Sequence, residues 1–143
     1  MNSNMDQKWR QYPEDVLAGK IPAGKYIRLA CERYLDWMDN RKDIFFDEPR
    51  MDRIENFIGH MKHFEGRFNG KPFILLPWQR WVIASIFGFY YKDDPEKRVV
   101  EYVVLFLARK NAKTALSAAI LLAEMCVNQE HGSEQYIAAN TRD

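Results

Sequence analysis

The fold is decided by the stretch Arg98-Val-Val-Glu-Tyr-Val-Val-Leu-Phe-Leu-Ala-Arg-Lys-Asn-Ala-Lys-Thr-Ala115. Its first part, Val99 to Leu107, is rich in β-branched and aromatic residues, which is typical of a buried strand. A short polar turn follows, and residues 115–127 have the alanine and leucine content of a helix. A buried strand, a tight turn and a helix are the setting in which a phosphate-binding loop is credible.

The turn matches the phosphate-loop pattern G-x-x-x-x-G-K-[ST] only at its end. Lys113 and Thr114 agree with the pattern, whereas Leu107 and Ala112 stand where glycines are expected. An ordinary strand-to-helix turn, in which the lysine and threonine are a solvated helix start, is therefore the alternative interpretation.

Charge in the turn favours phosphate binding over that alternative. Three cations, Arg109, Lys110 and Lys113, lie where backbone N–H groups and the helix dipole attract an anion. Thr114 follows the lysine directly, which is the position expected for a hydroxyl ligand of Mg²⁺. The turn is thus predicted to bind a nucleotide phosphate.

A second strand is predicted at Glu134–Ala139, after the helix. Strand, crossover helix and strand form a right-handed βαβ unit with parallel strands, and the 109–114 turn then lies at a ligand-binding sheet edge. Two parallel strands do not make a stable sheet by themselves. We therefore expect an α/β fold, an incomplete P-loop NTPase, that is either part of a longer protein or pairs its strand edges with another copy.

The chain is expected to have two parts, a helical N-terminal region at residues 1–70 and a partial ATPase domain at residues 71–143. Residues 1–24 contain several helix breakers and are expected to be irregular. Apolar residues recur at helical spacing from Lys25 to about Asn40. A second amphipathic helix carries Met51, Ile54, Phe57, Ile58 and Met61 on one face.

A further helix is predicted to begin at Pro77 and to end near Gly88, because proline suits the first position of a helix. It is expected to direct Trp78, Trp81 and Ile86 toward the core, among others. Core packing is the preferred role of the two tryptophans over stacking on a base.

Composition excludes several classes of protein. With 47% hydrophobic residues in 143, the chain can build a core and is not expected to be disordered. Its formal charge of +1 provides no overall attraction to nucleic acid. Cys31 and Cys126 are expected to be buried thiols, because their spacing fits neither a disulfide nor a metal site. No signal peptide or membrane-spanning run is found, so a soluble cytoplasmic protein is expected.

Four short motifs, in this order, resemble the start of the large terminase subunit of tailed bacteriophages. They are Leu76-Pro-Trp-Gln79, Ile86-Phe-Gly88, Ala108-Arg-Lys-Asn-Ala-Lys-Thr114 and Tyr136-Ile-Ala-Ala139. The most similar branch has a deviant loop that reads Arg-Lys-Asn-Gly-Lys-Ser/Thr, so Ala112 is a departure. The likeness covers about residues 70–143, and a helical region before it suits the family.

The resemblance implies an ATP-driven motor that moves double-stranded DNA into a preformed capsid, with a nuclease domain in the full-length protein. Double-stranded DNA, the small terminase subunit and the portal protein would be its partners, in the cytoplasm of a bacterial host. Lys113 would bind the β- and γ-phosphates of ATP, Thr114 would hold Mg²⁺, and Arg109 would contact the γ-phosphate. The loop around the nucleotide would be completed by Lys110, Asn111, Ala112 and Ala115.

Gln79 resembles the glutamine that reads adenine upstream of the loop in this family. An amide side chain can both donate to and accept from the adenine edge. The alternative is a residue at a helix start that bonds the local backbone.

Other functions stay open. No apolar run ending in Asp-Glu follows the loop, and the acidic cluster of a nuclease is missing, so neither rapid ATP hydrolysis nor DNA cleavage is expected from this chain alone. One alternative is a helicase-like P-loop ATPase. Another is a non-catalytic assembly module, which would self-associate or dock a partner through the helices at 25–61.

Overall fold

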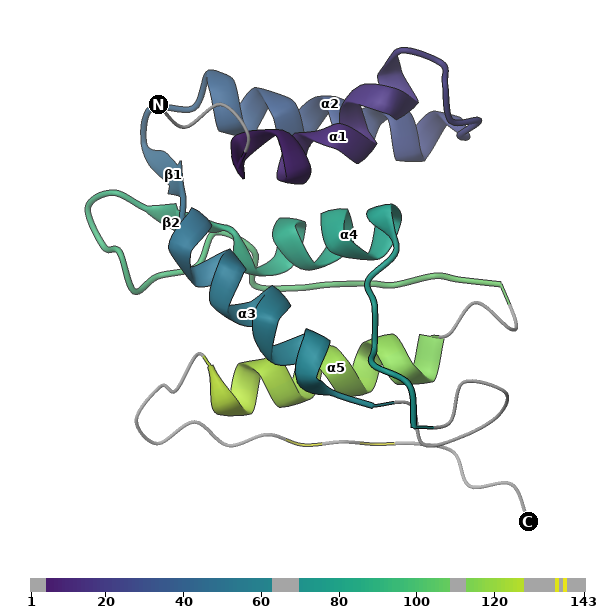
Figure 1. Ribbon diagram of the computed structural model, residues 1–143. Coiled ribbons are helices and arrows are strands. Elements are labelled where there is room, and N and C mark those ends of the chain that lie inside the picture. The colour runs from purple at the N-terminus through teal and green to yellow at the C-terminus, as the bar shows by residue number, and fades with distance from the viewer. Residues whose placement is uncertain (1–4, 63–69, 109–112, 128–135, 137, 139–143) are drawn as a thin grey trace.

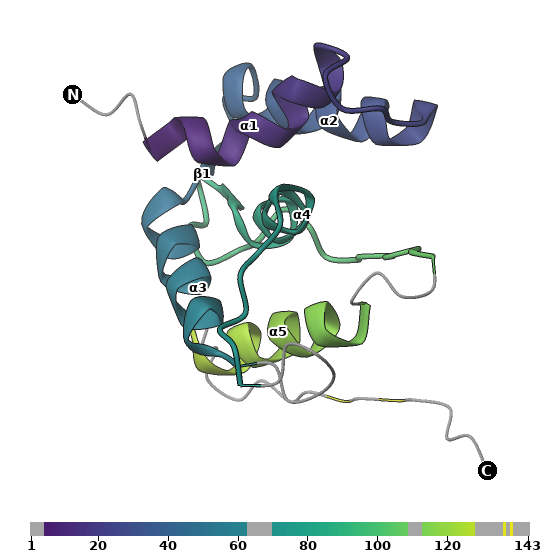
Figure 2. The ribbon, with the colours of Figure 1, turned by 45° about the vertical axis from the view of Figure 1, so that its right-hand side comes forward.

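The computed structural model describes residues 5–62, 70–108, 113–127, 136 and 138 (Figure 1). Helices α1 and α2 lie together on one side of α4, and α5 lies on the other side (Figures 1 and 2). Helix α3 runs beside α4 and α5 and contacts both. The elements within the described ranges are α1 (Met5–Leu17), α2 (Lys25–Asp39), β1 (Ile44–Phe46), α3 (Glu48–His60), α4 (Pro77–Phe87), β2 (Phe89–Tyr91) and α5 (Lys113–Cys126).

Helix α1 corrects the prediction that residues 1–24 are irregular. It includes Pro13, whose ring is fully buried, and it also buries Trp9 and Val16 on the same face. A proline inside a helix costs about 3 kcal/mol. Burying each large apolar side chain contributes about 1.5–3 kcal/mol, which offsets that cost. The helical spacing of Trp9 and Val16 could have predicted this helix, but the helix-breaking residues in the segment pointed to an irregular structure.

The C-terminal end of α1 is capped by backbone hydrogen bonds. Gly19 has a φ of 76°, in the left-handed region that glycine adopts readily. Its N–H donates to Val16 O at 3.1 Å, and Lys20 N–H donates to Asp15 O at 2.9 Å. These two bonds form a Schellman motif, which turns the chain toward α2.

The next two helices agree with the prediction. Helix α2 ends at Asp39 and buries Cys31 and Tyr34. Helix α3 buries Met51, Ile54 and Ile58, and its first turn is capped by Asp47, which accepts a hydrogen bond from Arg50 N–H. Amphipathic spacing therefore placed both helices correctly.

Strands β1 and β2 form an antiparallel pair that the sequence did not predict. Ile44 pairs with Tyr91, and Phe46 pairs with Phe89. The Phe46 and Phe89 rings lie 5.2 Å apart, and Tyr34 packs edge-on to Phe89 at 5.3 Å. The strands are held by this aromatic cluster as well as by their hydrogen bonds.

The predicted strand at Val99–Leu107 is wrong for the structure as described. No strand includes these residues, and Tyr102, Val104 and Phe106 are 90%, 91% and 98% exposed. A strand requires a neighbour for its backbone N–H and C=O groups. Of the predicted partner 134–139, only residues 136 and 138 are described, and neither is in a strand. The parallel βαβ unit is thus not present among the described residues, whose sheet is antiparallel.

Helix α4 begins at Pro77 and ends at Phe87, before Gly88, as predicted. Trp81 and Ile86 are buried as expected, and Ile83 and Phe87 are buried as well. The helix lies between the α1–α2 layer and α5 (Figure 1). Because it has neighbours on two sides, its apolar residues are not confined to a single stripe.

Helix α5 confirms the predicted alanine-rich helix. It buries Leu116, Ala119 and Ala123, which recur at helical spacing. Of the two cysteines predicted to be buried, Cys31 is buried and Cys126 is exposed. No helix in the described part of the chain is long and apolar enough to cross a membrane.

Candidate nucleotide site

The first turn of α5 contains the lysine and threonine of the predicted phosphate loop. Helix α5 begins at Lys113, and both Lys113 and Thr114 are exposed, whereas Ala115 is partly buried against the core. A helix start of this kind presents N–H groups that have no partner within the helix, together with the positive end of the dipole. The helix half of the strand–loop–helix pattern is therefore confirmed.

The loop itself lies outside the described residues. This applies to Arg109, Lys110, Asn111 and Ala112, so their roles stay predictions. The strand before the loop is not formed, as shown above.

Gln79 lies in the first turn of α4 and is 2% exposed. Its Oε1 accepts a hydrogen bond of 2.9 Å from Leu76 N–H. This is the local backbone interaction that the sequence left open as an alternative to adenine binding. The adenine role stays a prediction, and it requires the base to reach a buried amide.

The first turns of α4 and α5 lie on the same side of the molecule in Figure 1. Residues 99–108 run between the two helices toward that side in both ribbon views. The structure thus places the helix starts that carry Gln79 and Lys113 at one end of the molecule, although they are separated in sequence.

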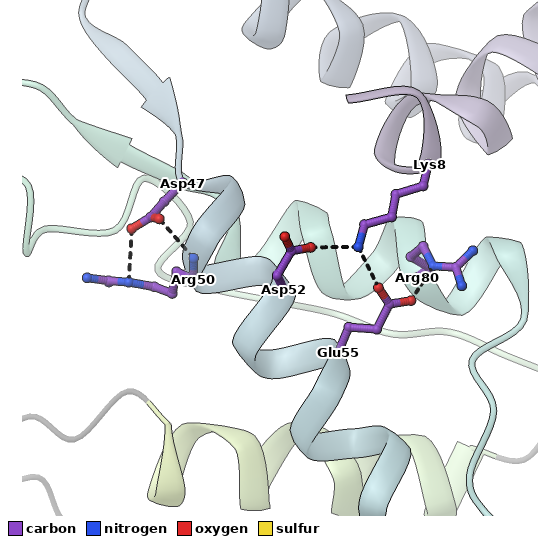
Figure 3. Close-up of polar contacts among 6 residues, drawn as sticks. All are labelled: Lys8, Asp47, Arg50, Asp52, Glu55 and Arg80. Atoms are coloured by element: carbon purple, nitrogen blue, oxygen red, sulfur yellow. Dashed lines mark hydrogen bonds and ion pairs between the residues drawn. The ribbon is translucent and has the colours of Figure 1, made fainter. Parts of the chain in front are cut away.

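Four charged side chains from three helices meet beside the first turn of α4 (Figure 3). Arg80 Nε donates to Glu55 Oε1 at 2.6 Å. Lys8 Nζ lies 3.0 Å from Glu55 Oε2 and 2.6 Å from Asp52 Oδ1. Burial alone would raise the pKa of Glu55, but the hydrogen bonds from Lys8 and Arg80 prevail and lower the pKa below its ordinary value.

Residues 77–143 match the family model described as terminase large subunit, ATPase domain. This part of the chain is therefore similar to the ATPase domain of the terminase large subunit. The match begins at the first residue of α4 and includes Gln79, Lys113 and Thr114. The resemblance inferred from the short motifs is thereby confirmed. No curated protein and no solved structure shows a significant match to the chain.

The region that matches the family model also borders a cavity of about 280 Å³. At its edge, Arg98 Nη1 donates to Glu124 Oε2 at 2.9 Å. The cavity lies toward the C-terminal ends of α4 and α5, away from Lys113, so it is not the predicted nucleotide site. Its lining consists of Ile86, Phe87, Arg98, Ile120, Leu121, Glu124 and Tyr136.

The cluster of Lys8, Asp52, Glu55 and Arg80 is the feature of the site that sequence reasoning missed. Glu55 is separated by 47 residues from Lys8 and by 25 residues from Arg80. No local pattern links charges at such distances along the chain, so only the packing of α1, α3 and α4 brings them together.

Proposed function

We propose that the chain binds ATP with Mg²⁺ as the ATPase region of a terminase large subunit, whose hydrolysis of ATP drives double-stranded DNA into a capsid. The observation that carries this proposal is the family match over residues 77–143. The exposed Lys113 and Thr114 at the start of α5 support it, because the family's phosphate loop ends in these residue types. Double-stranded DNA, the small terminase subunit and the portal protein are the proposed partners.

The residues of the loop would act mainly through charge. Phosphoryl transfer requires positioning and cations around the developing negative charge, with little covalent chemistry from the protein. Lys113 would bind the β- and γ-phosphates, Thr114 would hold Mg²⁺ through its hydroxyl, and Arg109 would stabilise charge on the γ-phosphate. Gln79 would hydrogen-bond the adenine.

Titration with a non-hydrolysable ATP analogue and Mg²⁺ tests the proposal, with Lys113→Ala as the critical variant. Loss of a charge-assisted hydrogen bond costs about 1.5–3 kcal/mol, so the affinity should fall about 10- to 100-fold. Lys25→Ala is a matched control, because Lys25 is also an exposed first residue of a helix. Equal affinity in the two variants, or no binding by the unmodified chain at millimolar analogue, would overturn the proposal.

Ala112 is predicted to weaken nucleotide binding. If the loop requires a positive φ at this position, an alanine costs about 1–2 kcal/mol relative to glycine. Its methyl group would also crowd the approach of the phosphates. Ala112→Gly should therefore tighten binding of the ATP analogue in the same titration, and unchanged or poorer affinity would contradict the assigned loop.

Hydrolysis is expected to be slow in this chain even when ATP is bound. The sequence has no apolar run ending in Asp-Glu, which would orient the attacking water and help to hold Mg²⁺. A phosphate-release assay on the purified chain checks this expectation, and rapid turnover would contradict it.

A second function is favoured by one observation, the exposure of Tyr102, Val104 and Phe106. An exposed apolar segment in extended form is a template for strand pairing. The chain would then act as an assembly module that associates with itself. Sedimentation velocity, together with the ATP-analogue titration, separates the two functions. Self-association without ATP affinity would favour the assembly role, whereas ATP binding by a monomer would favour the nucleotide role.

A further inference from the structure

Glu55 is the one residue in the described cluster that contacts both the N-terminal helix α1 and the start of α4 (Figure 3). One carboxylate oxygen accepts from Arg80 Nε, and the other accepts from Lys8 Nζ. Its side chain is 23% exposed, and those of Lys8 and Arg80 are 32% and 28% exposed. The cluster is thus partly withdrawn from water, where ion pairs are screened less than on an open surface.

Arg80 connects this cluster to the first turn of α4. Its backbone N–H donates to Leu76 O at 2.9 Å. Leu76 N–H, in turn, donates to Gln79 Oε1 at 2.9 Å. Leu76 is therefore held at its carbonyl by Arg80 and at its amide by Gln79, and the guanidinium of Arg80 is held by Glu55.

We propose that Glu55 is a positioning residue for recognition of the adenine base by Gln79. Glu55 fixes the Arg80 side chain and thereby holds the first turn of α4, which sets the position of the Gln79 amide. Glu55 also binds Lys8, and this contact links the first turn of α4 to α1. The N-terminal helices thus act on the base end of the nucleotide, whereas the phosphates are bound at the start of α5. This inference rests on the proposed function, because it assumes that Gln79 faces a bound adenine.

Two ligands distinguish the contribution of the base end of the nucleotide site from that of its phosphate end. An ATP analogue uses both ends, and inorganic tripolyphosphate uses only the phosphate end. In Glu55→Gln, affinity for the ATP analogue should fall about three- to ten-fold, the range expected for one hydrogen bond. Affinity for tripolyphosphate should stay within about two-fold, because the start of α5 does not depend on the Glu55–Arg80 ion pair.

Asp52→Asn is the matched control. It removes a carboxylate that contacts Lys8 but leaves the Glu55–Arg80 ion pair in place. Its affinities for both ligands should equal those of the unmodified chain. If Asp52→Asn lowers the affinity for the ATP analogue as much as Glu55→Gln does, the loss comes from the charge of the whole cluster, and the role of Glu55 is overturned.

Hydrogen exchange at the Leu76 amide provides a readout without any ligand. This amide should exchange faster in Glu55→Gln than in the unmodified chain or in Asp52→Asn, because the turn that holds Gln79 is loosened. Unchanged exchange, or equal losses of affinity for both ligands, would overturn the inference. Failure of the unmodified chain to bind either ligand would instead overturn the proposed function, so the two failures are distinguishable.

Discussion

Two apolar segments, α4 and residues 99–108, differ sharply in how much of their side chains the fold buries. Helix α4 buries Trp81, Ile83 and Phe87, whereas Val104 and Phe106 are more than nine-tenths exposed. A helix makes its backbone hydrogen bonds within itself, so α4 requires only side-chain neighbours. An extended segment requires a second strand. Strands β1 and β2 have only three residues each, but they pair with each other and pack against an aromatic cluster.

The same contrast holds between the packed core around α4 and two exposed stretches that follow it, residues 99–108 and the end of α5. Helices α1 and α3 and strand β2 contact α4, and residues of α2 and β1 belong to the same hydrophobic core. The segment 99–108 and the end of α5 contribute the exposed residues Tyr102, Phe106 and Cys126. Three predictions test whether this difference in packing is also a difference in stability.

The largest effect is expected in the reactivity of the two thiols. Burial, with a contribution from Glu32, raises the pKa of Cys31 to about 11, whereas Cys126 is exposed. Alkylation followed by mass spectrometry should show rapid modification of Cys126. Cys31 should react more slowly by several orders of magnitude, because it requires opening of the core, at about 5–15 kcal/mol if the whole domain unfolds. Both thiols should react alike in concentrated guanidinium chloride, and equal rates without denaturant would refute the packed core around α2.

The second effect compares two phenylalanines. Phe89 is 1% exposed and contacts the rings of Tyr34 and Phe46, whereas Phe106 is 98% exposed. Phe89→Ala should lower the free energy of unfolding by about 3–5 kcal/mol. Phe106→Ala should change it by no more than about 0.5 kcal/mol. Denaturant titration followed by tryptophan fluorescence measures both, and a comparable loss in Phe106→Ala would show that residues 99–108 are packed in solution.

The smallest effect concerns the charge cluster beside α4. The folded-state pKa of Glu55 is lowered, so its stabilising contribution is complete above the unfolded value of 4.5 and is lost as the pH falls through the folded value. Glu55→Gln should therefore be less stable than the unmodified chain at pH 7, by about 1 kcal/mol or less. The difference should shrink at about pH 3.

Urea titrations at the two pH values measure this change, with Glu96→Gln as the control. Glu96 is 86% exposed and lies 3.8 Å from Arg50, so its removal should have little effect at either pH. A difference between Glu55→Gln and the unmodified chain that does not change with pH would show that the carboxylate is not the source of the stabilisation.

The amino-acid sequence by itself determined α2, α3, α4 and α5, because helical spacing, Pro77 and the alanine-rich composition act within a few residues. It also determined that Lys113 and Thr114 stand at a helix start. For Gln79 the sequence allowed either adenine or the local backbone, and the structure shows the bond to Leu76 N–H.

Only the tertiary structure decided the features that depend on distant neighbours. Burial of Trp9 and Val16 in the core keeps α1 helical despite Pro13. Strand β1 pairs with β2, although α3 and α4 lie between them in the sequence. Val99 N–H donates to Phe89 O in β2, but residues 99–107 are in no strand of the described chain although their composition favours one. The Glu55 carboxylate accepts hydrogen bonds from Lys8 and Arg80, which lie on two other helices. Helices are encoded locally because their hydrogen bonds are local, whereas strand pairing and charge clusters require partners that packing alone supplies.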